Sequence, residues 1–363
     1  MMPRVKSKNL FNFQPAGVID NDIVAIEAQM NKATPTAKEK NEDTTITTKV
    51  AEVSSNDDKA SNHGFVNKIR SMVDGMMEMM GKAPVYVKAC EETIESEIKV
   101  PTSHDGEHDV IVQVLTPKAL KGSKNNAAFV YAHGGGAVAG TAAKFKPMLS
   151  HMAINGNVVL FNVDYRLAPE TKCPNNVKDF YMAIKYVANN AEKLGIDPSK
   201  IAMGGESGGG YICLGAEVLL AQNDETGLVK LAIPGIPMTD DYLFSDPAAM
   251  TIEERDNCFM MRKVWTLIAA DMEKQKQDPL LFPGKASLEI LQKFPPTIIF
   301  EVEFDMFITE ATRMAFKLRA AGRLLEFIVI PGSKHASYAT PNTKCFKMAN
   351  DAYKLAFNEY LHN

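Results

Sequence analysis

Ser207 lies in the glycine-rich segment GESGG at residues 205–209, and its hydroxyl group is suited to nucleophilic chemistry. The apolar run KIAMGG leads into it, and a helical pattern, YICLGAEVLL, follows it. On a tight turn from a strand to a helix, a serine hydroxyl projects from the sheet edge, and its neighbours must be small because the backbone is strained and closely approached. We interpret Ser207 as a nucleophile; the alternative is a glycine-rich turn with an incidental serine. The amide of Gly208 would then lie at a helix N-terminus, where it can donate to an anion.

A second glycine-rich segment, HGGG at residues 133–136, follows the apolar run AAFVYA. Because Gly134 and Gly135 lack side chains, their backbone N–H groups can point at one oxygen, as an oxyanion loop requires. The rival interpretation is a dinucleotide-binding fingerprint over residues 134–139, but it lacks the acidic residue expected about twenty positions later. We expect His133 to position the loop rather than to act as an acid or base.

A serine nucleophile needs a base and an orienting acid, which follow it in the order Asp or Glu, then His, in sheets of this kind. Asp305 comes just after the run TIIFEVE, and His335 comes just after LEFIVIPG. Both therefore lie at the C-terminal ends of strands, on the same sheet edge as Ser207. Glu303 is the competing acid, and the other interpretation of Asp305 is a cap for the following helix.

Two further polar segments could carry chemistry. HDGEH at residues 104–108 matches an inverted zinc-protease pattern, but that pattern needs a helix, whereas Asp-Gly between alternating runs indicates a hairpin turn. We therefore predict no metal site there. Asp164 and Arg166, in the segment DYRLAPE, are expected to pair with each other and brace the loops beneath the site.

The chemistry-bearing residues follow a regular alternation of strand and helix patterns. Alternating polarity predicts an antiparallel pair at a sheet edge, and near-continuous apolar runs predict buried parallel strands. The predicted strands are residues 93–101, 108–117, 127–132, 157–164, 200–205, 228–235, 297–303 and 325–332. Helical patterns lie between most of them, which favours an open, mostly parallel sheet wrapped by helices.

The rest of the chain divides into an N-terminal part and an insertion. Residues 1–62 are interpreted as an N-terminal segment that is partly a flexible linker, because residues 31–62 are polar and lack a period. Residues 63–84 form an amphipathic helix, either an ordinary core stripe or a Met-rich wall over a binding site. From residue 85 the chain is expected to form strands, and the 85–363 domain carries an insertion above the sheet at about 239–296.

Composition limits the partners and the compartment. Forty Lys and Arg against 44 Asp and Glu give a net charge of −4, so a nucleic-acid partner is not expected. Five cysteines without a CxxC pair indicate a reducing compartment. No apolar run suggests stable membrane insertion or a secretory signal, and we expect a cytoplasmic protein, with an organelle-targeting N-terminus as the alternative. A homodimer is left open.

Together, these segments resemble the hormone-sensitive-lipase-like branch of the α/β-hydrolases, which includes arylacetamide deacetylase and many bacterial esterases. The resemblance covers about residues 85–361 and rests on HGGG, DYRLAPE, GESGG, Asp305 with Glu310, and His335. It implies an α/β-hydrolase fold with a mostly parallel eight-stranded sheet, flanking helices and a helical cap. It also implies ester hydrolysis without a cofactor.

Carried over by position, the resemblance assigns three catalytic residues and three oxyanion donors: Ser207 as the nucleophile, Asp305 as the acid, His335 as the base, and the amides of Gly134, Gly135 and Gly208. The sequence departs from the family where the acid motif, usually DPLxDE, reads DMFITE. It departs again after the histidine, where Ala-Ser replaces the common Gly-Phe. These changes affect the expected pocket shape more than the triad.

The resemblance and the apolar cap together predict small or medium uncharged carboxylic esters as substrates. The predicted cap residues are Phe65, Met72, Met76, Met80, Phe259, Met260 and Trp265. Two alternatives use the same fold: an amide deacetylase or acyltransferase with the same triad, and a receptor that binds a small molecule without turnover. The presence of His335 argues against the receptor, because receptors of this fold lack the catalytic histidine.

Overall fold

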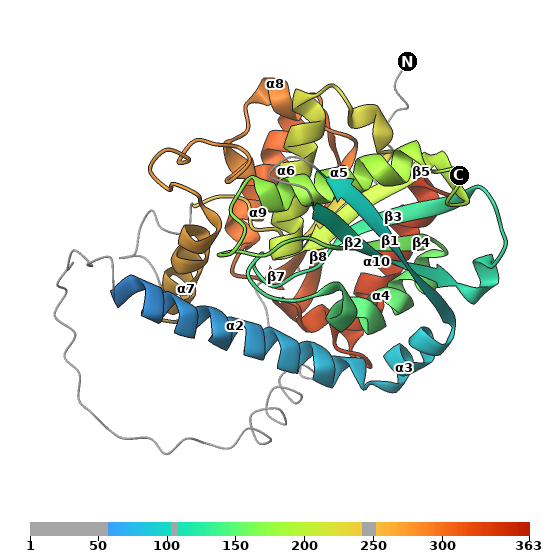
Figure 1. The fold of residues 1–363 in the computed structure, drawn as a ribbon, viewed down its shortest axis with the longest axis horizontal. Coiled ribbons are helices and arrows are strands. Elements are labelled where there is room, and N and C mark those ends of the chain that lie inside the picture. The colour runs from blue at the N-terminus through green and yellow to red at the C-terminus, as the bar shows by residue number, and fades with distance from the viewer. Residues whose placement is uncertain (1–56, 103–107, 242–251) are drawn as a thin grey trace.

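The computed structural model describes residues 57–102, 108–241 and 252–363, which build around an eight-stranded sheet (Figure 1). Its order is β1-β2-β4-β3-β5-β6-β7-β8, with β2 antiparallel to β1 and β4 and the other pairs parallel. The strands are β1 (Thr93–Thr102), β2 (His108–Pro117), β3 (Asn126–Ala132), β4 (Val159–Asp164), β5 (Ile196–Glu206), β6 (Leu231–Gly235), β7 (Thr297–Phe304) and β8 (Leu324–Lys334). This arrangement confirms the predicted α/β-hydrolase sheet, including the antiparallel pair at its edge. The residues between β1 and β2, predicted as a hairpin turn, lie outside the described residues.

Helices follow or flank most of the strands. Within the described residues, none of them is both long and apolar enough to cross a membrane. The helices are α2 (Asp57–Gly81), α3 (Pro84–Glu91), α4 (Ala142–Gly156), α5 (Asn175–Asn189), α6 (Gly208–Gln222), α7 (Ile252–Ile268), α8 (Leu288–Leu291), α9 (Ile308–Ala320) and α10 (Lys344–Tyr360).

The central strand β3 shows how both faces of the sheet are covered. Ala128 and Val130 pack with residues of α5 and α6, whereas Phe129 and Tyr131 pack with residues of α4 and α10. Because successive strand residues point to opposite faces, a strand covered on both sides needs apolar residues throughout. The near-continuous apolar runs in the sequence follow from this two-sided burial (Figure 1).

The first strand begins at Thr93, as predicted, but the start of the region expected to form strands, from residue 85, is occupied by helix α3. Pro84 lies in its first turn, where the missing N–H of proline leaves no helical hydrogen bond unmade. The Tyr86 ring is buried, and its hydroxyl donates to the carbonyl of Ala339 far along the chain. This tertiary anchor outweighs the strand preference of the valines on either side of Tyr86.

Helix α2 begins earlier and faces the core differently than predicted. It starts at Asp57, so residues 57–62 are helical rather than part of a linker; residues 1–56 lie outside the described part. Its buried side chains are Val66, Val73 and Met77, whereas Met72 is 59% exposed and does not belong to the buried face. The other predicted cap residues of this helix, Phe65, Met76 and Met80, are partly buried, so contacts with the sheet-covering helices determine which apolar side chains are fully covered.

Helices α2 and α7 pack together beside the sheet (Figure 1). Val66 of α2 belongs to the same apolar cluster as Met261 and Val264 of α7, and the Lys263 ammonium lies 4.6 Å from the centre of the Phe65 ring. The two elements predicted as a cap therefore meet. The predicted insertion contains α7 and α8 and no strand among its described residues, and the side chain of Phe259 lies outside them.

Candidate active site

Ser207 occupies the turn between β5 and α6. Its backbone has φ 58° and ψ −119°, a conformation that a residue with a side chain rarely adopts. The turn is held from outside, because the Ser207 amide donates to the carbonyl of Gly235 at 2.9 Å. This strand–turn–helix geometry, predicted from GESGG, projects the hydroxyl beyond the end of the sheet.

His335 and Asp305 meet Ser207 at this edge of the sheet. The His335 Nε2 atom lies 2.9 Å from Ser207 Oγ, and Nδ1 lies 2.7 Å from Asp305 Oδ2. His335 follows β8 directly and Asp305 follows β7, so the ends of three parallel strands supply the three groups. The structure thus brings together the serine, imidazole and carboxylate that the sequence separates by 98 and 30 residues.

The surroundings of His335 favour its charged form. Loss of water around the ring alone would lower the pKa of His335, but the charge and hydrogen bond of Asp305 raise it above the ordinary value, with a further contribution from Glu206. Asp305 is itself held by the amide of Phe307, which donates to Oδ1 at 2.8 Å. The Phe307 ring meets the imidazole edge-on, with 5.3 Å between ring centres.

Glu303, the competing acid, does not contact the imidazole. Its Oε2 accepts a hydrogen bond from the amide of Gly332 at 2.8 Å, within β8. Glu303 therefore links β7 to β8, and Asp305 is the carboxylate that reaches His335.

The HGGG loop packs against the serine turn. A Cβ atom at Gly208 would lie 2.4 Å from the Ala137 nitrogen and 2.5 Å from the Gly136 nitrogen, closer than real contacts allow. A Cβ atom at Gly134 would meet the carbonyl of Glu206 at 3.2 Å. Among the described residues, the turn and loop hydrogen bonds include none donated by the amides of Gly134, Gly135 or Gly208. This is the state that the predicted role as oxyanion donors requires.

His133 holds the loop, as predicted. Its ring is fully buried between Phe145 and Tyr165, with ring centres 5.3 and 4.5 Å away, and its Nδ1 lies 2.9 Å from the carbonyl oxygen of Gly134. The Tyr165 hydroxyl donates to the His133 carbonyl at 2.7 Å. Burial lowers the pKa of His133, so the ring supports the backbone as a neutral group.

The predicted pairing of Asp164 with Arg166 is wrong. Arg166 Nε donates to Asp179 of α5 at 2.8 Å, and Asp164 accepts from the amide of Ala142 at 2.7 Å, at the start of α4. Both residues still brace loops below the site. Each does so through a helix rather than through the other, Arg166 through α5 and Asp164 through the start of α4.

Only His108 of the HDGEH segment is among the described residues. His108 lies 3.1 Å from Asp179 through Nε2, while His104 and Glu107 lie outside the described residues. Across the described ranges, no three or more His, Cys, Asp or Glu side chains gather as a metal site would require.

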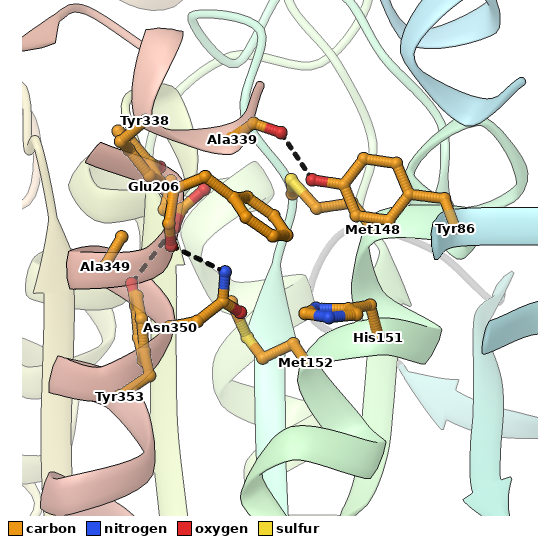
Figure 2. Close-up of a pocket in the computed structure, with 11 residues that line it drawn as sticks. Tyr86, Met148, His151, Met152, Glu206, Tyr338, Ala339, Ala349, Asn350 and Tyr353 are labelled. Atoms are coloured by element: carbon orange, nitrogen blue, oxygen red, sulfur yellow. Dashed lines mark hydrogen bonds between the residues drawn. The ribbon is translucent and has the colours of Figure 1, made fainter. Parts of the chain in front are cut away.

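The sequence did not point to Glu206, the residue before the serine, as part of the site. Its carboxylate is buried behind the serine turn, where Tyr353 Oη donates to Oε1 at 3.0 Å (Figure 2). Burial raises the pKa of Glu206, and hydrogen bonds from Tyr338 and Tyr353 counteract the shift. An adjoining cavity of about 30 Å³, bounded across from Glu206 by His151, has room for about two water molecules. The signal in the sequence was an acidic residue at the end of an apolar strand.

A serine, an imidazole and a carboxylate that touch at the C-terminal edge of such a sheet define the active site of an α/β-hydrolase. Comparison with known proteins agrees, since residues 129–339 match the α/β-hydrolase fold family. The chain is 32% identical to carboxylesterase NlhH of Mycobacterium tuberculosis over 238 residues, which cover 64% of this chain and 72% of that protein. Over 100 residues it is 32% identical to the hormone-sensitive lipase of Mus musculus, covering 28% of this chain and 13% of the lipase.

Among solved structures, a bacterial heroin esterase superposes with a TM-score of 0.70 at 27% identity, covering 82% of this chain and 92% of the esterase. The chain therefore belongs to the α/β-hydrolase family, within its hormone-sensitive-lipase-like carboxylesterases.

Proposed function

We propose that this protein is a serine carboxylesterase that hydrolyses small to medium uncharged carboxylic esters through an acyl-enzyme intermediate. The observation that carries the proposal is the continuous contact from Ser207 Oγ to His335 Nε2 at 2.9 Å and from His335 Nδ1 to Asp305 Oδ2 at 2.7 Å. Such a chain of hydrogen bonds converts a weakly nucleophilic hydroxyl into an attacking group.

In the proposed reaction, His335 removes the hydroxyl proton while Ser207 Oγ attacks the ester carbonyl carbon. The tetrahedral oxyanion is held by the amides of the HGGG loop and of Gly208, which lie beside the serine turn. His335 then gives its proton to the leaving alcohol, and the acyl group stays on Ser207. Water, activated by the same imidazole, releases the carboxylic acid and restores the serine. Asp305 orients the imidazole and stabilises its charged form without taking the proton.

Apolar side chains around the site support the substrate class. Val264 lies within 3.4 Å of where a Cβ atom at Gly136 would be, which brings α7 next to the HGGG loop. Trp265 and Met261 on the same helix are buried, and Phe307 contacts His335. Transferring a charged substrate from water to such an apolar surface costs free energy, whereas burying an uncharged ester there is favourable.

Hydrolysis of p-nitrophenyl esters from acetyl to palmitoyl tests this proposal. We expect turnover of the short and medium chains, an initial burst of nitrophenol, and a loss of about 10⁶-fold in kcat for Ser207→Ala. Turnover of only the longest chains would contradict the substrate class. Equal rates for wild type and Ser207→Ala would contradict the mechanism, and tight ligand binding without turnover would favour a receptor.

A further inference from the structure

A second buried carboxyl group lies behind the catalytic acid. Glu301 is a charged residue type in the middle of β7, yet it is fully buried and lies between apolar neighbours along the strand. Ile299, two residues earlier, packs in the cluster formed by α6, α8 and α9, so strand alternation directs Glu301 toward the same face. The strand ends at Phe304, and the side chain of Asp305, the next residue, interacts with the Glu301 carboxyl group.

Asp305 and Glu301 differ in how many of their carboxyl oxygens have a hydrogen-bond partner. Asp305 accepts from the Phe307 amide at 2.8 Å and contacts the His335 imidazole at 2.7 Å, so each of its oxygens has a partner. Glu301 Oε1 accepts from the Val302 amide at 2.9 Å, but no donor reaches Oε2 within the part of the chain that the structure describes. A buried carboxylate oxygen without a donor is costly, and more so when it faces another carboxylate.

A single proton between the two groups resolves this conflict. Glu301 is the group placed to carry this proton, because its Oε2 has no donor among the described residues, whereas both oxygens of Asp305 have hydrogen-bond partners. Burial raises the pKa of Glu301 well above its ordinary range, and Asp305 and Glu310 raise it further. Glu310, in the first turn of α9, is the other carboxyl group that acts on Glu301, and its Oε1 also lacks a partner among the described residues.

We propose that Glu301 is held as the neutral acid and donates a hydrogen bond from Oε2 to the Asp305 carboxylate. Glu301 is then a positioning residue that extends the Ser207–His335–Asp305 chain by one member. Its donated bond keeps Asp305 directed at the imidazole and moderates how strongly Asp305 stabilises the imidazolium. This role in the reaction rests on the proposed esterase function, whereas the protonation of Glu301 does not.

Infrared spectroscopy tests the protonation independently of catalysis. The spectra are recorded at neutral pH on the Ser207→Ala protein with and without the additional substitution Glu301→Gln. We expect the difference spectrum to show that the Glu301→Gln protein has lost the carbonyl stretch of one protonated, hydrogen-bonded carboxyl group. Loss of an ionised carboxylate band instead would overturn the proposal, whether or not the wild type is an esterase.

The pH dependence of kcat/KM tests the link to Asp305. Glu301→Leu removes the donor and keeps a similar side-chain volume, so Asp305 should stabilise the imidazolium more strongly. The pKa of the acidic limb of the kcat/KM profile should then rise by about 0.5–1 unit, and kcat should fall about tenfold. Glu301→Gln retains a donor and should restore the limb and most of the lost rate. Thermal unfolding of both variants checks their folding.

Two results would overturn the link. A folded Glu301→Leu protein whose acidic limb matches wild type would show that the proton of Glu301 serves Glu310 or the fold rather than Asp305. A Glu301→Gln limb displaced to lower pH would show that wild-type Glu301 carries a negative charge. If the wild type lacks turnover, the esterase proposal fails while the infrared result still decides the state of Glu301.

Discussion

Backbone geometry at the glycines is as important as the three reacting side chains. Ser207 has a positive φ, its amide is held by the carbonyl of Gly235, and Gly208 lets the HGGG loop approach the turn. The same closeness sets the distance between the nucleophile and the amides proposed to hold the oxyanion. We therefore expect glycine at position 208 to be required for catalysis and not only for folding.

Replacing Gly208 by alanine should displace the HGGG loop. The new Cβ atom would lie 2.4 Å from the Ala137 nitrogen, so one backbone must move and the oxyanion donors separate. We expect kcat for p-nitrophenyl butyrate to fall about 10²–10³-fold. Gly227→Ala is the matched control, because a Cβ atom there meets nothing within 4 Å. Equal rates for the two variants, both folded by circular dichroism, would refute this account of Gly208.

Asp305→Asn should act on both the rate and its pH dependence. Removing the negative charge lowers the pKa of His335, so the acidic limb of kcat/KM should move to lower pH. The rate constant kcat should fall about 10⁴-fold, because the amide favours the wrong imidazole tautomer. Rates measured from pH 5 to 9 check both effects. Glu303→Gln should keep the wild-type limb, since Glu303 contacts Gly332 instead. A larger effect at Glu303 would reverse the assignment of the acid.

At the scale of elements, helix α7 connects helix α2, the other part of the predicted cap, to the residues around the nucleophile. Trp265 contacts Tyr211, four residues after the nucleophile, with 5.2 Å between ring centres, and Phe282 at 4.9 Å. Through Phe65 and Val66, α2 packs against the same helix. Helices distant in sequence thus form one apolar layer next to the HGGG loop, and this layer is the surface that we propose selects the ester.

Trp265→Ala should loosen that layer and the fold together. Truncating a fully buried tryptophan costs about 3–5 kcal/mol in the free energy of unfolding. We also expect KM for medium-chain esters to rise more than KM for acetyl esters, because longer acyl chains would touch more of the layer. Urea denaturation and the acyl-chain series measure the two effects. The exposed Thr266→Ala should change stability by less than about 0.5 kcal/mol; a similar loss in both variants would contradict the role of Trp265.

At the scale of the whole molecule, buried acids make stability depend on pH. Among the described residues, burial raises the pKa of the four buried glutamates: Glu206, Glu217, Glu301 and Glu310, the last to about 8. The native state holds protons that the unfolded chain releases above about pH 4.5. These groups therefore make the free energy of unfolding fall as pH rises above this value.

Glu217→Gln tests this effect away from the active site. Glu217 is fully buried and accepts a hydrogen bond from Thr297 at 3.0 Å. The variant should lose less stability between pH 5 and 7 than wild type, with a slope smaller by up to about 1.4 kcal/mol per pH unit. Chemical denaturation at several pH values measures the slopes. An unchanged slope, equal to that of the exposed Glu289→Gln, would show that Glu217 is ionised in the native protein.

The sheet and the triad could be predicted because they leave local signals. Two-sided burial requires apolar runs, and Ser207, Asp305 and His335 each come just after such a run. Contacts between distant elements leave weaker signals. The buried stripe of α2 and the helix at Tyr86 depend on partners that no local pattern reveals. Glu301 is visible as an acid in an apolar strand, but its meeting with Asp305 depends on how β7 ends.

The most direct measurement of the central claim is covalent capture of the nucleophile. The protein is treated with a fluorophosphonate, its intact mass is measured, and the modified peptide is sequenced by mass spectrometry. We expect a single adduct on Ser207, formed much more slowly in His335→Ala and absent in Ser207→Ala. No adduct on the folded wild type, or an adduct on another residue, would contradict it.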